Sequence, residues 1–167
     1  MIKRWQKFHD NCKLHIGSES GQALIETGIS SLLLILLLLG AVELGTTAYA
    51  SIEVANSAKA AAQYATMSGG AWTSTGLDTV GMLNAAQADA GNLVSNVTFP
   101  TAPTYTCSCS GAGTATCSTS PPTGCAGSHL IVTVTVRTQA SFSPLIRFWN
   151  GFTSITLNGY AQEEVLQ

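Results

Sequence analysis

Charged residues are scarce in this chain of 167 residues, since Lys, Arg, Asp and Glu make up only 10 % of it. Positive charge is scarcest after the first thirteen positions. Beyond Lys13 the cationic residues are Lys59, Arg137 and Arg147, against seven acidic residues after Gly21. This part of the chain is therefore mildly acidic and has no basic patch. Such a balance argues against a nucleic-acid partner, because nucleic-acid-binding surfaces are strongly basic.

Residues suited to catalysis are equally sparse. After Gly21 the sole histidine is His129, beside Ser128, and a surface position at the end of a strand explains it better than a triad base. Asp78 and Asp89 lie on a predicted helix with no metal-ligand cluster nearby, so we interpret them as solvated-face or helix-cap residues. The segment GAGTA lacks the lysine of a phosphate-binding loop. We therefore expect no enzymatic activity, no cofactor and no metal site.

Proline is absent before Pro100, so no residue of this type breaks a helix in the first 99 positions. What this region contains instead is apolar residues, with LLLILLLL at 32–39 and no charge between Glu26 and Glu43. The cationic residues that precede this run are Lys3, Arg4, Lys7 and Lys13. The positive-inside rule then keeps the N-terminus in the cytoplasm and places residues after about 48 outside it.

Three interpretations of this apolar segment stay open. A cleaved secretory signal would end at Ala48-Tyr49-Ala50, which fits the small-x-small pattern. A plain signal anchor would use Glu26 and Glu43 as boundary acids near the lipid headgroups. In the third, a cut between Gly21 and Gln22 makes Glu26 the fifth residue of the mature chain. A new α-ammonium group then lies one helical turn from a carboxylate whose burial in lipid needs a partner of opposite sign.

The residues of the third interpretation resemble a known family. G-QALIE, the leucine-rich run, AVELGTTAYA and ANSAKAAAQYA are similar to the TadE-like family, the pseudopilins (minor pilins) of the Tad, or Flp, type IV pilus system. The resemblance covers roughly residues 20–68. It implies that a prepilin peptidase cuts after Gly21, leaving Gln22 first, and that Glu26 serves in subunit docking. Thr27 stands where the Flp-type motif often has tyrosine, so a TadG-like relative stays open.

The resemblance implies a structural subunit, a minor pilin that assembles into a Tad/Flp-type pilus or a related secretion apparatus. Its implied partners are the prepilin peptidase, other pilin subunits, the inner-membrane assembly platform and membrane lipid. The implied location is the bacterial inner membrane, crossed once with the C-terminus outside, and the pilus after assembly. The alternative is a single-pass membrane-anchored exterior module for binding or adhesion, without a role in pilus assembly.

The predicted organisation is a cytoplasmic leader over 1–21, a helical segment over 22–68 that crosses the membrane at about 24–46, and an exterior domain over 69–167. We expect one helix from about Gln22 to Met67, ended by Gly69-Gly70. Steps of three and four residues predict its buried stripe beyond the membrane: Ala48, Ile52, Ala55, Ala58, Ala62 and Ala65. The polar residues predicted elsewhere around the helix are Glu53, Asn56, Ser57 and Gln63.

The exterior domain is predicted to contain a short helix and a small antiparallel sheet. The helix should start near Thr75 and run through LDTVGMLNAAQADAG, with five apolar positions: Leu77, Val80, Met82, Leu83 and Ala86. Strand signals occur in NLVSNVTF, PTYTCSC, HLIVTVTVRT and SITLNGYAQEEV. In the third of these the residues expected on one face are Leu130, Val132, Val134 and Val136. The sequence thus predicts an α+β, lollipop-like pilin fold in which the sheet covers the helix.

Four cysteines lie in the loop 107–125, with the spacing C-x-C-x7-C-x7-C: Cys107, Cys109, Cys117 and Cys125. Four thiolates would also suit zinc, but an exterior compartment favours two disulfides. A bond between Cys107 and Cys109 would strain the chain. Two pairings stay open, Cys107 to Cys117 with Cys109 to Cys125, or Cys107 to Cys125 with Cys109 to Cys117.

The segment SFSPLIRFWNGF, residues 141–152, joins the two strongest strands and contains many large apolar residues. These are Phe142, Leu145, Ile146, Phe148, Trp149 and Phe152. We interpret the segment as core that folds back onto the domain. The alternative is an exposed patch for a neighbouring subunit.

Overall fold

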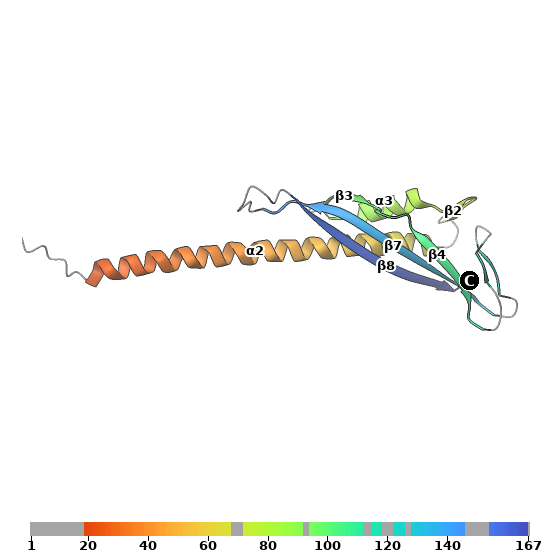
Figure 1. Cartoon of the computed structure of the whole chain (residues 1–167), viewed down its shortest axis with the longest axis horizontal. Coiled ribbons are helices and arrows are strands. Elements are labelled where there is room, and N and C mark those ends of the chain that lie inside the picture. The colour runs from red at the N-terminus through yellow and green to blue at the C-terminus, as the bar shows by residue number, and fades with distance from the viewer. Residues whose placement is uncertain are drawn as a thin grey trace, which may run out of the picture. The chain divides into compact units, whose positions relative to one another are not determined.

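The structure is a computed structural model that describes residues 19–67, 72–91, 94–111, 115–117, 122–125, 128–145 and 154–166. A long apolar helix is followed by a short helix and antiparallel strands (Figure 1), which confirms the predicted α+β class. The chain divides into two compact units, Met1–Ala41 and Val42–Gln167.

Helix α2, Glu19–Thr66, contains 48 residues. Leucine and alanine favour the helical conformation, and no proline interrupts it. In the first unit all side chains at positions 21–39 are exposed, and an 18-residue stretch reaches a mean hydropathy of 2.2. Within the described ranges, α2 is the one helix long and apolar enough to cross a membrane. It begins three residues before the predicted Gln22, and the predicted stop at Gly69-Gly70 lies outside the described residues.

The second unit is built on a four-stranded antiparallel sheet. Its strands are β3 (Val94–Thr98), β4 (Thr104–Cys109), β7 (Leu130–Phe142) and β8 (Ile155–Leu166). Strand β7 pairs with the other three. Strand β8 follows one edge of β7 from Ile131 to Phe142, while β3 and β4 share the opposite edge. All four predicted strands are therefore present, and β7 is longer than its predicted segment.

Alternation along β7 decides which face of the sheet is covered. Its even-numbered residues are buried and its odd-numbered ones are partly or fully exposed. The even-numbered face carries Leu130, Val132, Val134 and Val136, as predicted, and these residues share a core with the buried alanines of α2. The outer face is polar, as is usual when one side of an antiparallel sheet meets solvent.

The face of α2 that packs in this core differs from the predicted stripe. Three stripe residues are buried: Ala58, Ala62 and Ala65. The other three are exposed: Ala48, Ile52 and Ala55. The buried residues before them in the core are Ala50, Glu53, Val54 and Ser57. The prediction was wrong over this stretch because alanine occurs all around the helix, so the spacing of apolar residues does not single out one face.

Helix α2 and the sheet approach closely at one point. The Thr138 hydroxyl donates to the Val54 carbonyl oxygen at 2.9 Å, and the Ser57 hydroxyl lies 3.4 Å from the Thr138 hydroxyl. A Cβ added to Gly159 of β8 would collide with the Val54 carbonyl and the Thr138 side chain. Glycine inside this strand therefore makes room for the helix backbone.

The second helix, α3 (Thr79–Asp89), begins later than predicted. The residues before it form a small hairpin of β1 (Trp72–Thr73) and β2 (Gly76–Leu77). Gly76 has φ of 133°, a left-handed conformation that glycine adopts at little cost. This turn chemistry, rather than the apolar spacing, decides the structure around Thr75. Of the predicted apolar positions Met82 and Ala86 are buried, while Val80 is 68 % exposed.

The apolar segment 141–152 is described only up to Leu145. Phe142 ends β7 and is buried, whereas Leu145 is 70 % exposed. Ile146, Phe148, Trp149 and Phe152 lie outside the described residues. The core interpretation therefore holds for Phe142 and not for Leu145.

Candidate functional site

The predicted processing residues lie in the first turns of α2. Gly21 and Gln22 are exposed and follow the start of the helix at Glu19. A Cβ added to Gly21 would meet no atom within 4 Å. Glycine is less favourable than alanine in a helix by about 1 kcal/mol. Since packing in the described structure does not require glycine here, its role has to come from another source.

Glu26 lies one turn after Gln22, on the same side of the helix. Its side chain is exposed and has no hydrogen bond or ion pair with any described residue. Nearby hydroxyls are satisfied within the helix, since Thr27 donates to the Ala23 carbonyl at 2.8 Å and Ser31 to the Gly28 carbonyl at 2.9 Å. In a membrane these hydroxyls need no outside partner, whereas an ionised Glu26 does.

Glu43, the predicted membrane-boundary acid, is half-buried in the second unit. Its carbonyl oxygen accepts hydrogen bonds from the hydroxyls of Thr46, at 3.0 Å, and Thr47, at 2.8 Å. Three polar residues therefore gather within two turns at the end of the apolar run. The position of Glu43 relative to a membrane surface stays a prediction.

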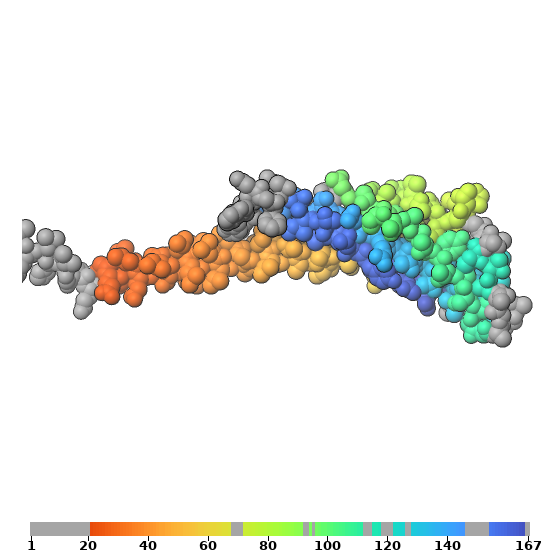
Figure 2. All heavy atoms as spheres, in the orientation of Figure 1, coloured from red at the N-terminus to blue at the C-terminus, as the bar shows by residue number. Residues whose placement is uncertain are grey.

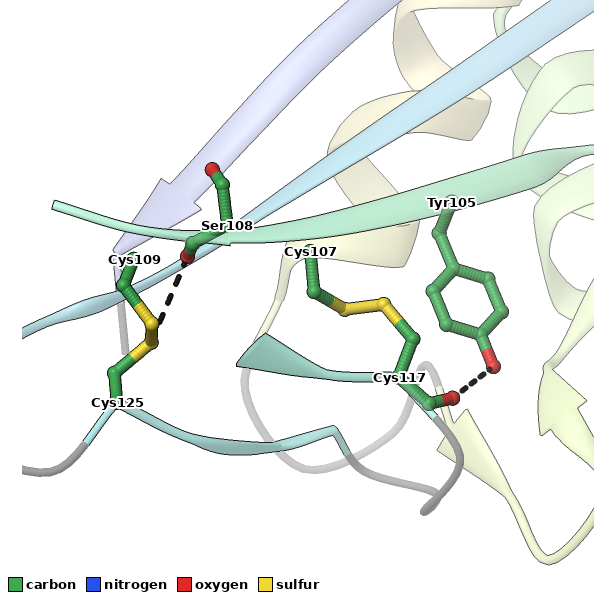
Figure 3. The surroundings of a disulfide bond; sticks show 6 residues. All are labelled: Tyr105, Cys107, Ser108, Cys109, Cys117 and Cys125. Atoms are coloured by element: carbon green, nitrogen blue, oxygen red, sulfur yellow. Dashed lines mark hydrogen bonds between the residues drawn. A yellow bond between two sulfur atoms is a disulfide. The ribbon is translucent and has the colours of Figure 1, made fainter. Parts of the chain in front are cut away.

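The four cysteines of the loop form two disulfides (Figure 3). Cys107 is bonded to Cys117, with Cα atoms 5.8 Å apart, and Cys109 to Cys125, with Cα atoms 5.5 Å apart. This is one of the two pairings left open by the sequence. Cys107 and Cys109 are two residues apart in β4, so their side chains lie on the same side of that strand and both bonds leave from that side.

The bonds attach a small hairpin, β5 (Ala115–Thr116) with β6 (Thr123–Gly124), to the main sheet. The Tyr105 hydroxyl donates to the Cys117 carbonyl at 3.3 Å, and the Tyr105 ring meets Trp72 edge to face at 5.0 Å between centroids. The loop is thus ordered by covalent bonds and aromatic contacts with its surroundings rather than by a core of its own.

The residues weighed for catalysis lie apart from one another. His129 is exposed just before β7, where its main-chain N–H donates to the Ser110 hydroxyl at 3.1 Å. Asp78 caps α3, accepting from the Gly81 N–H and the Tyr64 hydroxyl, each at 3.0 Å. Asp89 is exposed at the last residue of α3. In the part of the chain that the structure describes, no three His, Cys, Asp or Glu side chains gather as a metal site.

The Asp78 cap shifts two ionisation equilibria. The hydrogen bonds from the Gly81 N–H and then the Tyr64 hydroxyl lower the pKa of Asp78 below its ordinary value. In turn, the bond to Asp78 and partial burial raise the pKa of Tyr64. This pairing also explains Gly81, because a Cβ there would meet both Tyr64 and Asp78.

Two features of the second unit were missed by sequence reasoning. Glu53 was predicted to face away from the core, yet it is 9 % exposed and its carboxylate lies against Gly91, after α3. Tyr49 and Ile52, three residues apart on α2, are each 56 % exposed. Nothing in the sequence around Gly91 indicates its contact with Glu53, and nothing around Ile52 indicates that its side chain is exposed.

Comparison with protein families gives a match over residues 21–63 to the model described as TadE-like protein. This segment is TadE-like. The match confirms the resemblance seen in the sequence and indicates a minor-pilin-like protein associated with the Tad pilus. The TadE-like segment consists of α2 from Gly21 almost to its end, and its single apolar helix fits a single-pass membrane anchor. Comparisons with curated proteins and with solved structures give no match.

Proposed function

We propose that this protein is a minor pilin, a structural rather than catalytic subunit that is cut by a prepilin peptidase between Gly21 and Gln22 and then joins a Tad/Flp-type pilus or a related secretion apparatus. The supporting observation is the start of the TadE-like match at Gly21. The family segment begins at the junction where the mature chain would begin, and the preceding leader is left out of it.

Before assembly α2 holds the subunit in the inner membrane, with the second unit outside. Cleavage turns the main-chain nitrogen of Gln22 into an α-ammonium group. The Glu26 carboxylate then pairs with such a group, on its own chain or on a neighbouring pilin, and avoids the cost of an unpaired charge in lipid. Glu26 supports this role because it has no partner among the described residues.

The surface of α2 supports contact with neighbouring helices. Glycine costs helix stability, yet Gly28, Gly40 and Gly45 all border open space in the described structure. Small residues at such positions let another helix approach closely in a membrane. Tyr49 and Ile52 are exposed and lie on the same side of α2 as Gly45. We assign these residues to packing against other pilin subunits and the assembly platform.

The cleavage step is tested by replacing Gly21 with valine in cells that contain the pilus system. Gly21→Val should remain at full length, because the peptidase needs a small residue before the cut. Gly28→Val is the matched control, since both glycines lie in α2 with open space around them. It should be processed normally. Intact mass and N-terminal sequencing of the membrane fraction report the result.

The wild-type N-terminus separates the remaining interpretations. A start at Gln22 supports the minor pilin, while a start at Met1 supports a plain anchor with a binding or adhesion domain. A start at Ser51 supports a secreted protein. As a second arm, Glu26→Gln should leave insertion intact but abolish co-purification with other pilins. Normal pilus incorporation of that variant would remove Glu26 from the docking role.

A further inference from the structure

The outer face of the sheet contains a cleft of about 280 Å³. Pro100 and Thr101 line one side of it, and Asn158 and Tyr160 of β8 line the other, with Arg137 of β7 between them. In Figure 1 strands β7 and β8 pass in front of α2, and Figure 2 shows the same side of the molecule as spheres. The residues that line the cleft belong to the second unit, and none of them is on α2.

The cleft exists because one row of the sheet is interrupted. Strand β3 ends at Thr98, opposite Gln139, and β4 begins at Thr104, opposite Thr135. Between them the chain passes through Pro100 and Pro103, which have no N–H to donate to a ladder. No described strand therefore pairs with this edge of β7 beside Arg137.

Arg137 has its hydrogen-bonding capacity unused in this cleft. Its guanidinium lies 5.6 Å from the centre of the Tyr160 ring, its direct partner across the β7–β8 register. Within the described ranges it makes no ion pair or hydrogen bond. A guanidinium stacked on an aromatic ring is held in place, and its N–H groups match the two oxygens of a carboxylate.

Among the described residues that line the cleft, the polar groups around Arg137 are uncharged. Two hydrogen bonds orient them. The Gln139 amide donates to the Asn158 side-chain oxygen at 3.3 Å, and the Tyr160 hydroxyl donates to the Gln162 side-chain oxygen at 2.9 Å. Within the described ranges the Asn158 NH2 group and the Thr101 hydroxyl have no hydrogen-bond partner and can bond to a ligand. Tyr160 is 55 % exposed and offers ring surface beside them.

We propose that this cleft binds a hexuronate residue of an acidic polysaccharide. The carboxylate would pair with Arg137, the sugar hydroxyls would bond to Asn158 and Thr101, and the ring of the sugar would lie against Tyr160. The volume suits one sugar ring, since sites for larger ligands occupy about 300–1,000 Å³. Pro100 and the Tyr160 ring give this cleft apolar surface beside its amide and hydroxyl groups. A sugar ring has C–H faces and hydroxyl edges and therefore presents both kinds of group. This activity adds to the proposed assembly role and does not depend on cleavage after Gly21.

The test measures binding of tetragalacturonate to the full chain in detergent micelles by titration calorimetry, with maltotetraose as the neutral comparison. Tetragalacturonate should bind at least about tenfold more tightly than maltotetraose, because hydrogen bonds to a charged group are strong. Arg137→Gln should lose at least about tenfold in affinity for tetragalacturonate, and Tyr160→Phe should retain most of it. Lys59→Gln is the matched control, because it removes the same charge from α2, away from the cleft.

Equal affinity of wild type and Arg137→Gln would overturn the proposal, as would the absence of binding at millimolar sugar. If the sugar fails to bind and Arg137→Gln also abolishes self-association of the protein, this second result identifies another occupant. The cleft would then hold an acidic side chain of a second copy. Melting curves of each variant show whether it is folded. Tyr160→Thr removes the ring on which the sugar would lie, so this variant should also bind tetragalacturonate more weakly, and unchanged affinity would count against the proposal.

Discussion

Gly159 illustrates how one residue sets the distance between α2 and the sheet. Gly159→Ala places a methyl group against the Val54 carbonyl and the Thr138 hydroxyl. Overpacking of this kind costs about 1–3 kcal/mol in the free energy of unfolding. Gly45→Ala, with open space around it, should stay within about 1 kcal/mol of wild type. Thermal unfolding of the two variants in the same micelles measures the difference, and equal stabilities would show that the sheet can move away at this point.

Glu53 and Gly91 form a second contact that no sequence pattern predicts. The Glu53 carboxylate occupies the space that a Cβ at position 91 would fill. One of its oxygens, Oε2, is buried without a hydrogen-bond partner in the described ranges. A helix pattern assigns a glutamate to the solvent side by default, because charge is costly to bury. Only the tertiary contact with Gly91, which follows α3, explains why the residue is covered.

At the scale of elements, the capping of α3 predicts a dependence on pH. The pKa of Asp78 is lowered in the folded chain by the Gly81 N–H and the Tyr64 hydroxyl. Its contribution is therefore complete above the unfolded pKa of about 3.9 and is lost as the pH falls through the lower folded pKa. The amide-exchange protection factors of α3, which are corrected for the intrinsic exchange rate at each pH, should fall in this acid range. Asp78→Asn keeps a capping side chain without the charge, so its exchange should lack this acid-dependent loss. The same acid response in Asp78→Asn would assign it to another group.

The elements differ in how well the sequence predicts them. Strand β7 alternates between valine and polar residues, so its buried face follows directly from the pattern. Helix α2 has alanine on both faces, so its existence is predictable but half of its buried stripe is not. The prediction of where α3 starts was wrong for a different reason. Gly76 adopts a left-handed conformation in a hairpin, and this local turn overrides the apolar spacing before Asp78.

The disulfide pairing belongs to the same scale. Sequence excludes a bond between Cys107 and Cys109 because of their separation, but it leaves Cys117 and Cys125 equivalent. The pairing depends on how the β5–β6 hairpin runs beside β4, with Cys117 after β5 and Cys125 after β6. Its direction is a tertiary feature that the cysteine spacing does not encode.

For the molecule as a whole, the two units obey different rules of burial. The first unit exposes nearly every apolar side chain of α2, from Leu24 to Leu39, whereas the second unit buries its valines and small residues in one core. A lipid environment accounts for the former and water for the latter. Residues 42–55 of α2 carry both kinds of surface, since Val54 faces the core while Ile52 does not. Substitutions at neighbouring positions of α2 should therefore affect either the stability of the fold or the proposed assembly, and not both.

This separation gives a prediction for Ile52 and Val54, two residues apart on α2. Ile52→Ser replaces an exposed apolar side chain, so its free energy of unfolding should stay within about 0.5 kcal/mol of wild type. Its co-purification with other pilin subunits should fall sharply, because the proposed packing surface is interrupted. Val54→Ala should show the reverse, losing about 2 kcal/mol of stability from the core while the folded fraction still assembles. Thermal unfolding and the amount of each variant in sheared pili measure the two effects. Wild-type levels of Ile52→Ser in pili would exclude this face of α2 from assembly and would leave the contact to the membrane segment alone.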